Sequence, residues 1–233
     1  MFCVKMADHA IGIENNYGYI KEYYSDYLTD DSPEFTISVT DEEICAENHD
    51  GGRWHKDYLE ILAVYRKICE RLIFDDIILF HCSALSINGK AILFTAPSGT
   101  GKSTHARLWR ERFGDKVVMI NDDKPLVKFS DKIFVYGTPY GGKDGIQTNT
   151  SAEVSAIVIL HQAPTNIITK ISADEAFTTL LTQTYRCSSV DGVLRTLPLL
   201  DRLSCLPVYS LGCTISQEAV ELVYDELAIQ LPL

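Results

Sequence analysis

The chain has 233 residues, of which 46% are hydrophobic and 23% charged, with a formal net charge of −11. This is the composition of a globular protein that can bury a sizeable core. The acidic balance argues against a nucleic-acid-binding surface, which needs clustered basic side chains. The longest apolar runs, such as 156–160, fall far short of the roughly 20 residues of a membrane span, and the start of the chain has no signal-peptide apolar region. We therefore expect a cytoplasmic protein with neither a membrane nor a nucleic acid as partner.

The cysteines give no sign of a disulfide framework or a zinc site. Seven of them are scattered along the chain without any C-x-x-C pair. An odd, scattered set favours reduced and mostly buried thiols.

Residues 1–56 carry no motif with chemical meaning. The first 20 residues show no strong period, and we expect short strands there. Residues 35–40 alternate apolar and polar side chains as a half-buried strand does, and the acidic residues from Asp41 can open a short helix. We expect a small α+β lobe at 1–56 that packs on or extends the portion at 57–233. The alternative is that this lobe forms a substrate-recognition surface.

The next segment predicts a helix followed by a β-hairpin. Residues 58–72 place apolar side chains at helical spacing, and 76–80 is typical of a buried strand that continues through 81–87. The pair Asn88-Gly89 between two β-like runs is a strong hairpin signal. The strand after this turn should therefore run antiparallel to the strand before it, unlike the parallel sheet of an ordinary P-loop NTPase.

Residues 91–107 form the most informative stretch, AILFTAPSGTGKSTHAR. An apolar strand at 91–95 leads into a glycine turn, and a helix begins near Lys102. Gly99 and Gly101 let the backbone direct successive N–H groups at an anion. Lys102 can reach the β and γ phosphates and Ser103 can bind Mg²⁺. We expect a nucleotide-binding loop made of the following residues: Ser98, Gly99, Thr100, Gly101, Lys102, Ser103 and Thr104. Ala96 stands where the usual first glycine of this motif would be, and a residue that small still permits a variant loop.

An acidic pair follows the next strand. Residues 116–120 read KVVMI, a buried strand, and Asn121-Asp122-Asp123 comes directly after it. Carboxylates at this place are expected to serve Mg²⁺ and the attacking group. Adjacent side chains on a strand point to different sides, so Asp122 and Asp123 can divide these tasks. The alternative is a solvated turn.

The rest of the chain alternates strands and helices. A hairpin is predicted at 126–129 and 133–136, followed by a long, mobile-looking loop at 137–145. That loop could close over the phosphates with Lys143 neutralising transferred charge, or it could be a plain surface loop. The remaining predicted elements are a strand at 154–161 that ends in a structural His161, helices at 173–183, 192–203 and 217–229, and a strand at 207–211.

The runs HCSALSINGKAILFTAPSGTGKST and VVMINDD resemble the catalytic domain of HPr kinase/phosphorylase and, more widely, the phosphoenolpyruvate-carboxykinase-like P-loop kinases. In that group a histidine precedes a hairpin, the hairpin feeds the loop, and an Asp-Asp pair ends the next strand. His81, the loop from Ser98 to Ser103, and the pair Asp122-Asp123 match these features in order. The segments YGTPYGGK and VSAIVILHQAP look like smaller HPr-kinase-like proteins, some of which phosphorylate a serine on a precursor peptide. The resemblance covers about residues 76 to 215.

The resemblance implies an α/β fold with a mixed sheet, a small N-terminal α+β portion, and phosphoryl transfer from ATP with Mg²⁺. Lys102 would hold phosphates, Ser103 and Asp123 would share Mg²⁺, and Asp122 would be the base, with the two aspartates' roles exchangeable. His81 would lie beside the transferred group, unless it is a core histidine. The acceptor would be a hydroxyl on a peptide, a protein or a small molecule. The chain is too short for a carboxykinase and has no copy of the segment that docks HPr.

Two other functions remain open from the sequence. One is a nucleotide-binding switch or accessory protein without phosphoryl transfer, against which the intact Lys102, Ser103 and aspartate pair argue. The other is a peptide-binding module with a vestigial loop. The sequence leaves open the acceptor, the choice among ATP, GTP and pyrophosphate, and whether the chain forms a homo-oligomer.

Overall fold

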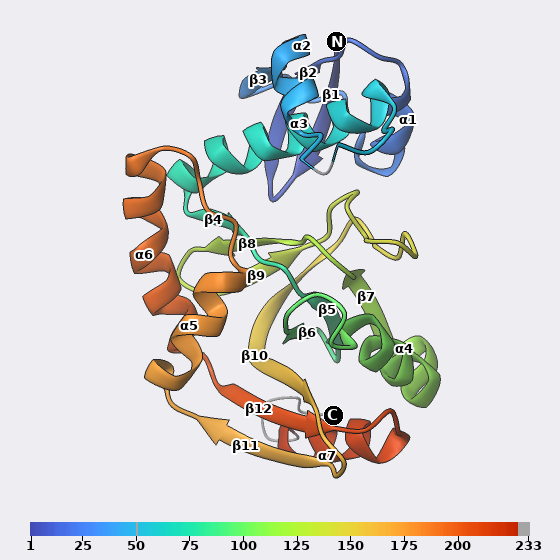
Figure 1. The fold of residues 1–233 in the computed structure, drawn as a ribbon, viewed down its shortest axis with the longest axis vertical. Helices are drawn as coiled ribbons and strands as arrows, with labels where there is room; N and C mark the ends of the chain where they lie inside the picture. The colour runs from blue at the N-terminus through green and yellow to red at the C-terminus, as the bar shows by residue number, and fades with distance from the viewer. Residues whose placement is uncertain (50, 228–233) are drawn as a thin grey trace.

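The first part of the chain folds into a small three-stranded sheet (Figure 1). The structure is a computed structural model that describes residues 1–49 and 51–227. Strands β1 and β2 form an antiparallel hairpin, and β3 pairs parallel to β2. Thr40 and Glu43 form a capping box at the start of α2, which is why the acidic run opens a helix there. The elements are β1 (Phe2–Met6), β2 (His9–Glu14), α1 (Tyr19–Tyr23), a 3₁₀ turn (Ser25–Tyr27), β3 (Phe35–Ser38) and α2 (Asp41–Ala46).

The long helix α3 (Lys56–Leu72) joins this sheet to the rest of the molecule. Its apolar face packs against the small sheet in one core that also contains Ile77 and Leu126 of the main sheet. Residues on both sides of the boundary that we expected at residue 56 therefore share one hydrophobic core. Figure 1 shows α3 lying between the small sheet and β4.

Within the described residues the main sheet has nine strands and is mixed, as the sequence predicted. The order is β4-β8-β9-β10-β6-β5-β7, and β12 and β11 continue from β10. Only the β10–β6 and β10–β12 pairs within it are parallel. The strands are β4 (Ile77–Leu79), β5 (Ser83–Ile87), β6 (Lys90–Thr95), β7 (Val117–Asn121), β8 (Leu126–Phe129), β9 (Ile133–Tyr136), β10 (Ser151–Gln162), β11 (Ile167–Ile171) and β12 (Val208–Cys213).

The predicted hairpin before the phosphate loop is confirmed. Ile87 pairs with Lys90 across Asn88 and Gly89, which have φ values of 53° and 76° as a two-residue hairpin turn requires. The expectation of one continuous strand over 76–87 is wrong. The chain breaks between β4 and β5 because β4 pairs with β8, whereas β5 lies between β6 and β7. This break places His81 between β4 and β5, where its carbonyl oxygen accepts a hydrogen bond from Thr95 at the end of β6.

Helices cover both faces of the main sheet (Figure 1). Helices α5 and α6 pack on one face, and α4 and α7 pack on the other, each with its own apolar core. No helix within the described residues is long and apolar enough to cross a membrane. The helices are α4 (Lys102–Phe113), α5 (Ala173–Gln183), α6 (Val190–Ser204) and α7 (Gln217–Leu227). The predicted end of the last helix, at 228 and 229, lies outside the described residues.

Candidate active site

The phosphate loop connects β6 to α4, as the sequence predicted. Gly99 and Gly101 have φ values of 80° and 121°, which side-chain-bearing residues rarely adopt. Gly101 is also the N-cap residue of α4, and glycine cannot supply the side-chain oxygen that caps many helices. The first N–H groups of α4 are therefore available to an anion, and the helix dipole favours negative charge at the same place.

Lys102 is an enclosed cation at the start of α4. Its side chain is buried, and Nζ donates a hydrogen bond to the carbonyl oxygen of Ala96 at 3.0 Å. Burial lowers the pKa of Lys102, while neighbouring groups, Cys82 and the two aspartates, oppose this shift. A buried ammonium held mainly by a carbonyl is a favourable partner for a phosphate.

The acidic pair is held by Asn121 at the end of β7. The Asn121 side chain is fully buried, and its Oδ1 accepts hydrogen bonds from the backbone N–H groups of Asp123 and Lys124 at 2.9 and 2.8 Å. Its Nδ2 donates to the carbonyl oxygen of Thr138 at 2.9 Å. Asn121 therefore fixes both the turn that carries the aspartates and the start of the 137–145 loop.

Asp122 faces the phosphate loop. It is 7% exposed and accepts a hydrogen bond from the hydroxyl of Ser83 on β5. Burial raises its pKa, hydrogen bonds from Ser83 and Ser103 oppose the shift, and the negative charges of Asp144 and Asp123 add to it. Ser103 thus lies beside Asp122, whereas the sequence analysis paired Ser103 with Asp123 and left the roles of the two aspartates exchangeable.

Asp123 faces His81. The Nε2 atom of His81 lies 3.3 Å from Oδ1 of Asp123, and Nδ1 of His81 lies 2.7 Å from Oε1 of Gln183. Burial alone would raise the pKa of Asp123, but the His81 hydrogen bond and the positive charges of Lys124 and Lys102 outweigh it and hold that pKa below its ordinary value. Asp123 is therefore an ionised carboxylate with a fixed orientation.

The 137–145 loop lies against the aspartates. Gly142 has a φ of 73°, and a Cβ added to it would approach Cβ of Asp123 to 3.2 Å. Its neighbour Lys143 lines the same cavity as Asp123. Tyr140 anchors the start of this loop, whereas residues 142–145 are exposed, and closure of the loop over phosphates stays a prediction. The Tyr140 ring stacks on Tyr65 at 3.7 Å, and its hydroxyl donates to the carbonyl oxygen of Ile61 at 2.6 Å.

One cavity of about 490 Å³ brings these groups together. Its lining contains almost all of the predicted site residues: His81, Ser98, Gly99, Gly101, Lys102, Ser103, Thr104, Asp122, Asp123 and Lys143. Thr100, the remaining one, lines a neighbouring cavity. Residues far apart in the sequence thus meet at the end of β6 and β7.

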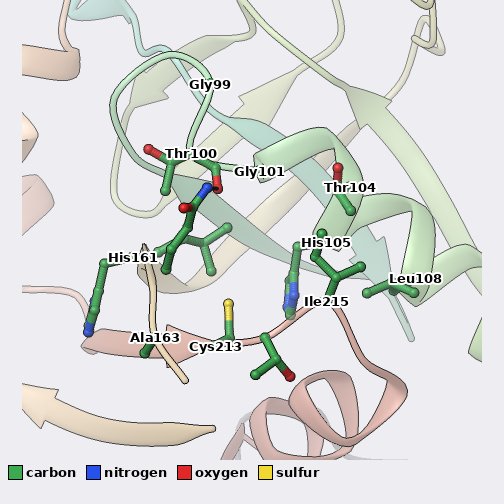
Figure 2. A pocket seen from close by; sticks show the side chains of 13 residues that line it. Gly99, Thr100, Gly101, Thr104, His105, Leu108, His161, Ala163, Cys213 and Ile215 are labelled. Atoms are coloured by element: carbon green, nitrogen blue, oxygen red, sulfur yellow. Dashed lines mark hydrogen bonds between the residues drawn. The ribbon is translucent and has the colours of Figure 1, made fainter. Parts of the chain in front are cut away.

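The neighbouring cavity, of about 460 Å³, shares Gly99, Gly101 and Thr104 with the lining of the first cavity (Figure 2). His105 of α4 lines it, and its Nε2 accepts a hydrogen bond from Trp109 at 3.1 Å. Burial lowers the pKa of His105 to about 4, so this ring is neutral at neutral pH. Figure 2 shows Cys213 and Ile215 approaching the cavity from the end of β12 and the segment after it. His161, expected to be structural, also lines it. The mainly apolar lining suits a flat organic group attached to phosphates.

Four side chains of the site were missed by sequence reasoning: Ser83, Asn121, Asp144 and Gln183. Asn121 stands directly before the acidic pair and directly after a predicted buried strand, and this position was the signal that the sequence offered for it. Ser83 and Gln183 had none, because each meets its partner only through the order of the strands and the packing of α5.

The donor set fits Mg²⁺ delivered by a nucleotide. Among residues 1–49 and 51–227, no group of three or more His, Cys, Asp or Glu side chains is arranged to hold a metal by itself. Mg²⁺ commonly takes only one or two carboxylates from the protein and completes its coordination with phosphates and water. Ser103 and Asp122 satisfy that requirement, and a cation would offset the crowded negative charge of Asp122 and Asp144.

Comparisons with known proteins give a weak structural likeness. No protein-family profile matches the sequence, and no curated protein matches it. A solved structure of the Hpr(Ser) kinase/phosphatase from Coxiella burnetii aligns with 65% of this chain and 97% of its own chain, at 11% identity and a TM-score of 0.41. At this level the likeness concerns the arrangement of elements alone and carries no information on substrate or mechanism.

Proposed function

We propose that the protein is an HPr-kinase-like kinase that transfers the γ-phosphoryl group of ATP to a serine- or threonine-type hydroxyl. The observation that carries this proposal is the single cavity that contains the phosphate loop, Lys102 and both aspartates. Phosphoryl transfer needs little covalent chemistry from a protein and depends on positioning and electrostatic stabilisation. The residues of this cavity are of the types that supply both.

The nucleotide would lie across the loop. Its phosphates would accept hydrogen bonds from the loop and from the first turn of α4, and Lys102 would turn from the Ala96 carbonyl to the phosphates. Its nucleoside would occupy the 460 Å³ cavity beside His105. Mg²⁺, when bound, would offset phosphate charge, and we assign Ser103 and Asp122 to hold it.

Asp123 is the best-supported base, which exchanges the roles that the sequence analysis gave the two aspartates. The lowered pKa of Asp123 keeps it ionised, and His81 orients it. The acceptor oxygen would form a bond to the γ phosphorus while the bond from that phosphorus to the β,γ-bridging oxygen breaks. The hydroxyl proton passes to Asp123, and ADP leaves. Lys143 would stabilise the charge of the transferred group.

Nucleotide-dependent stabilisation tests the proposal. Wild-type protein, Lys102→Ala and Lys170→Ala are unfolded thermally with and without ATP and Mg²⁺. Lys170 is an exposed residue of β11 and serves as the matched control. A ligand at a hundredfold over its dissociation constant adds about 3 kcal/mol of stability. We expect that gain in wild type and in Lys170→Ala and its loss in Lys102→Ala.

No stabilisation in any of the three proteins would contradict the nucleotide site. Stabilisation without transfer of label from ATP to any tested hydroxyl would instead favour a nucleotide-binding switch. Transfer of label that depends on Lys102 would support the kinase.

A further inference from the structure

The cavity of about 460 Å³ beside the phosphate loop contains a buried polar side chain with an unused hydrogen-bond donor. His105 of α4 is only 3% exposed and lines this cavity. Figure 2 shows its ring directed into the cavity, on the same side as Leu108 and Ile215. Buried polar groups are normally paired, so the partners of each ring nitrogen decide what this side chain can do.

The bond from Trp109 fixes which ring nitrogen of His105 carries the proton. The indole nitrogen of tryptophan can only donate, so Nε2 of His105, 3.1 Å away, accepts and must hold a free lone pair. The ring is then neutral and carries its one proton on Nδ1. His105 is therefore a hydrogen-bond donor at Nδ1 and cannot accept a hydrogen bond there.

The Nδ1–H group of His105 has no partner within the part of the chain that the structure describes. Among residues 1–49 and 51–227 no oxygen accepts a hydrogen bond from it, and it is not one of the unpaired polar atoms that are sealed from solvent. The group therefore opens to the cavity that the ring lines. In mainly apolar surroundings an N–H group gains most from a ligand that supplies an acceptor.

The ring of His105 has a fixed orientation. Phe94 of β6 is fully buried and makes a T-shaped contact with it at a centroid distance of 4.8 Å. Trp109 binds Nε2 from the next turn of α4. A donor that is already oriented in the free protein binds its acceptor at a lower entropic cost.

The position of His105 along α4 indicates which part of the nucleotide it would meet. His105 follows Gly101, the N-cap residue, by four residues, which is a rise of about 6 Å along the helix. The helix start is the proposed phosphate site, so the nucleoside would come next. The apolar side chains of Leu108, Leu160 and Ile215 line the same cavity. Ribose hydroxyls would lose water there, whereas a base is flat and carries acceptor nitrogens on its edge.

We propose that His105 is a specificity residue that donates a hydrogen bond from Nδ1 to a ring nitrogen of the nucleotide base, and that Trp109 is the positioning residue that keeps the proton on Nδ1. This rests on the proposed kinase function, because the cavity must receive the nucleoside of the phosphoryl donor. It adds a requirement on that donor, whose base must present an acceptor nitrogen to α4. His105 takes no part in the chemical step.

The test uses ADP with Mg²⁺, which cannot donate a γ-phosphoryl group, and four analogues: 1-deaza-, 3-deaza-, 7-deaza- and 2′-deoxy-ADP. Each deaza analogue replaces one ring nitrogen by C–H and so removes one acceptor. In calorimetric titrations, one deaza analogue should bind the wild type about tenfold more weakly than ADP. His105→Leu should bind ADP about tenfold more weakly and should no longer distinguish ADP from that analogue. His49→Leu, at a side chain that is 83% exposed, is the control and should match the wild type.

Nuclear magnetic resonance of the wild type, labelled with ¹⁵N in its histidines, tests the tautomer without a core variant. Before ADP is added, His105 should show a protonated Nδ1 and an unprotonated Nε2, and the Nδ1–H proton should move downfield when ADP binds. His105→Gln identifies the signal by its loss. Trp109→Phe removes the indole donor, so the proton should distribute between both ring nitrogens, and affinity for ADP should fall by less than tenfold.

The outcomes separate this proposal from the proposed function. If ADP binds the wild type but all analogues bind equally well, or if His105→Leu binds ADP as the wild type does, the proposal is overturned alone. A proton on Nε2 in the wild type, or a loss confined to 2′-deoxy-ADP, also overturns it. If His105→Leu does not fold, the wild-type analogue series and the tautomer decide. If neither ADP nor ATP binds the wild type, both proposals are wrong.

Discussion

The two sides of the proposed site are built from the sequence in different ways. The phosphate side comes from one continuous stretch, 96–104, whose conformation is set by two glycines and a helix start. The acceptor side assembles α1, α3, the end of β7 and the 137–145 loop. The first side is set by local backbone chemistry, whereas the second exists only once the small sheet has packed on the main one. A protein can therefore keep its donor site while the acceptor side changes with the packing of these elements.

The aspartates mark the border between the two sides, and exchanging them for asparagines gives the largest expected effect. Asp123→Asn should lower kcat by about 10²–10⁴-fold, because the amide cannot accept the proton, while stabilisation by ATP and Mg²⁺ persists. Asp122→Asn should instead weaken the dependence of nucleotide binding on Mg²⁺. Steady-state kinetics and thermal unfolding over a Mg²⁺ titration measure the two effects.

Asp115→Asn is the matched control for this pair, because Asp115 is exposed in the 3₁₀ turn before β7. It should match wild type in both measurements. The opposite pattern, with Asp122→Asn losing turnover and Asp123→Asn losing Mg²⁺ dependence, would return the aspartates to the roles first inferred from the sequence.

The sequence predicted those parts of the fold that short-range interactions determine. The Asn88-Gly89 hairpin and the strand, turn and helix around Gly101 follow from backbone preferences within a few residues. Helix α5 begins where Ser172 and Glu175 form a capping box. In each of these cases the deciding contacts are local.

Other features of the site depend on which strands become neighbours. Ser83 reaches Asp122 because β5 lies between β6 and β7, and no residue near Ser83 specifies that order. Gln183 meets His81 across 102 residues of chain. Strand β11 is short and has exposed positions, so its alternation gave no clear signal. The division of work between the aspartates was open for the same reason, since it depends on what each side chain faces.

The donor side should show a pH-dependent stability that comes from His105. Burial lowers the pKa of this histidine to about 4 from an ordinary value of 6.5, so between these values the unfolded chain binds a proton that the folded chain does not. Stability is therefore full above about pH 6.5 and is lost as pH falls towards 4, by about 3 kcal/mol in total. Urea unfolding of wild type and His105→Gln across this range isolates the contribution as a difference between the two proteins.

Glutamine keeps a hydrogen-bond acceptor within reach of Trp109, so the variant is expected to fold. His49→Gln, at a side chain that is 83% exposed, is the control. Its free energy of unfolding should change with pH as that of the wild type does. If the free energy of unfolding changes with pH equally in all three proteins, His105 does not resist protonation in the folded state.

On the acceptor side the expected effect is smaller and concerns the anchor of the 137–145 loop. The Tyr140 hydroxyl donates to the carbonyl oxygen of Ile61 and accepts a hydrogen bond from the buried Tyr24 hydroxyl at 2.8 Å. Tyr140→Phe removes both bonds and leaves Tyr24 without its acceptor, so we expect a loss of about 1–2 kcal/mol in the free energy of unfolding, measured with urea. Tyr24→Phe should cost less, because it leaves the bond to Ile61 intact. In the double variant the two losses should not add, because Tyr24→Phe removes the hydroxyl that Tyr140→Phe would leave without an acceptor. Additive losses would mean that the two hydroxyls are not coupled, and that the bond from Tyr140 to Ile61 holds the loop without help from Tyr24.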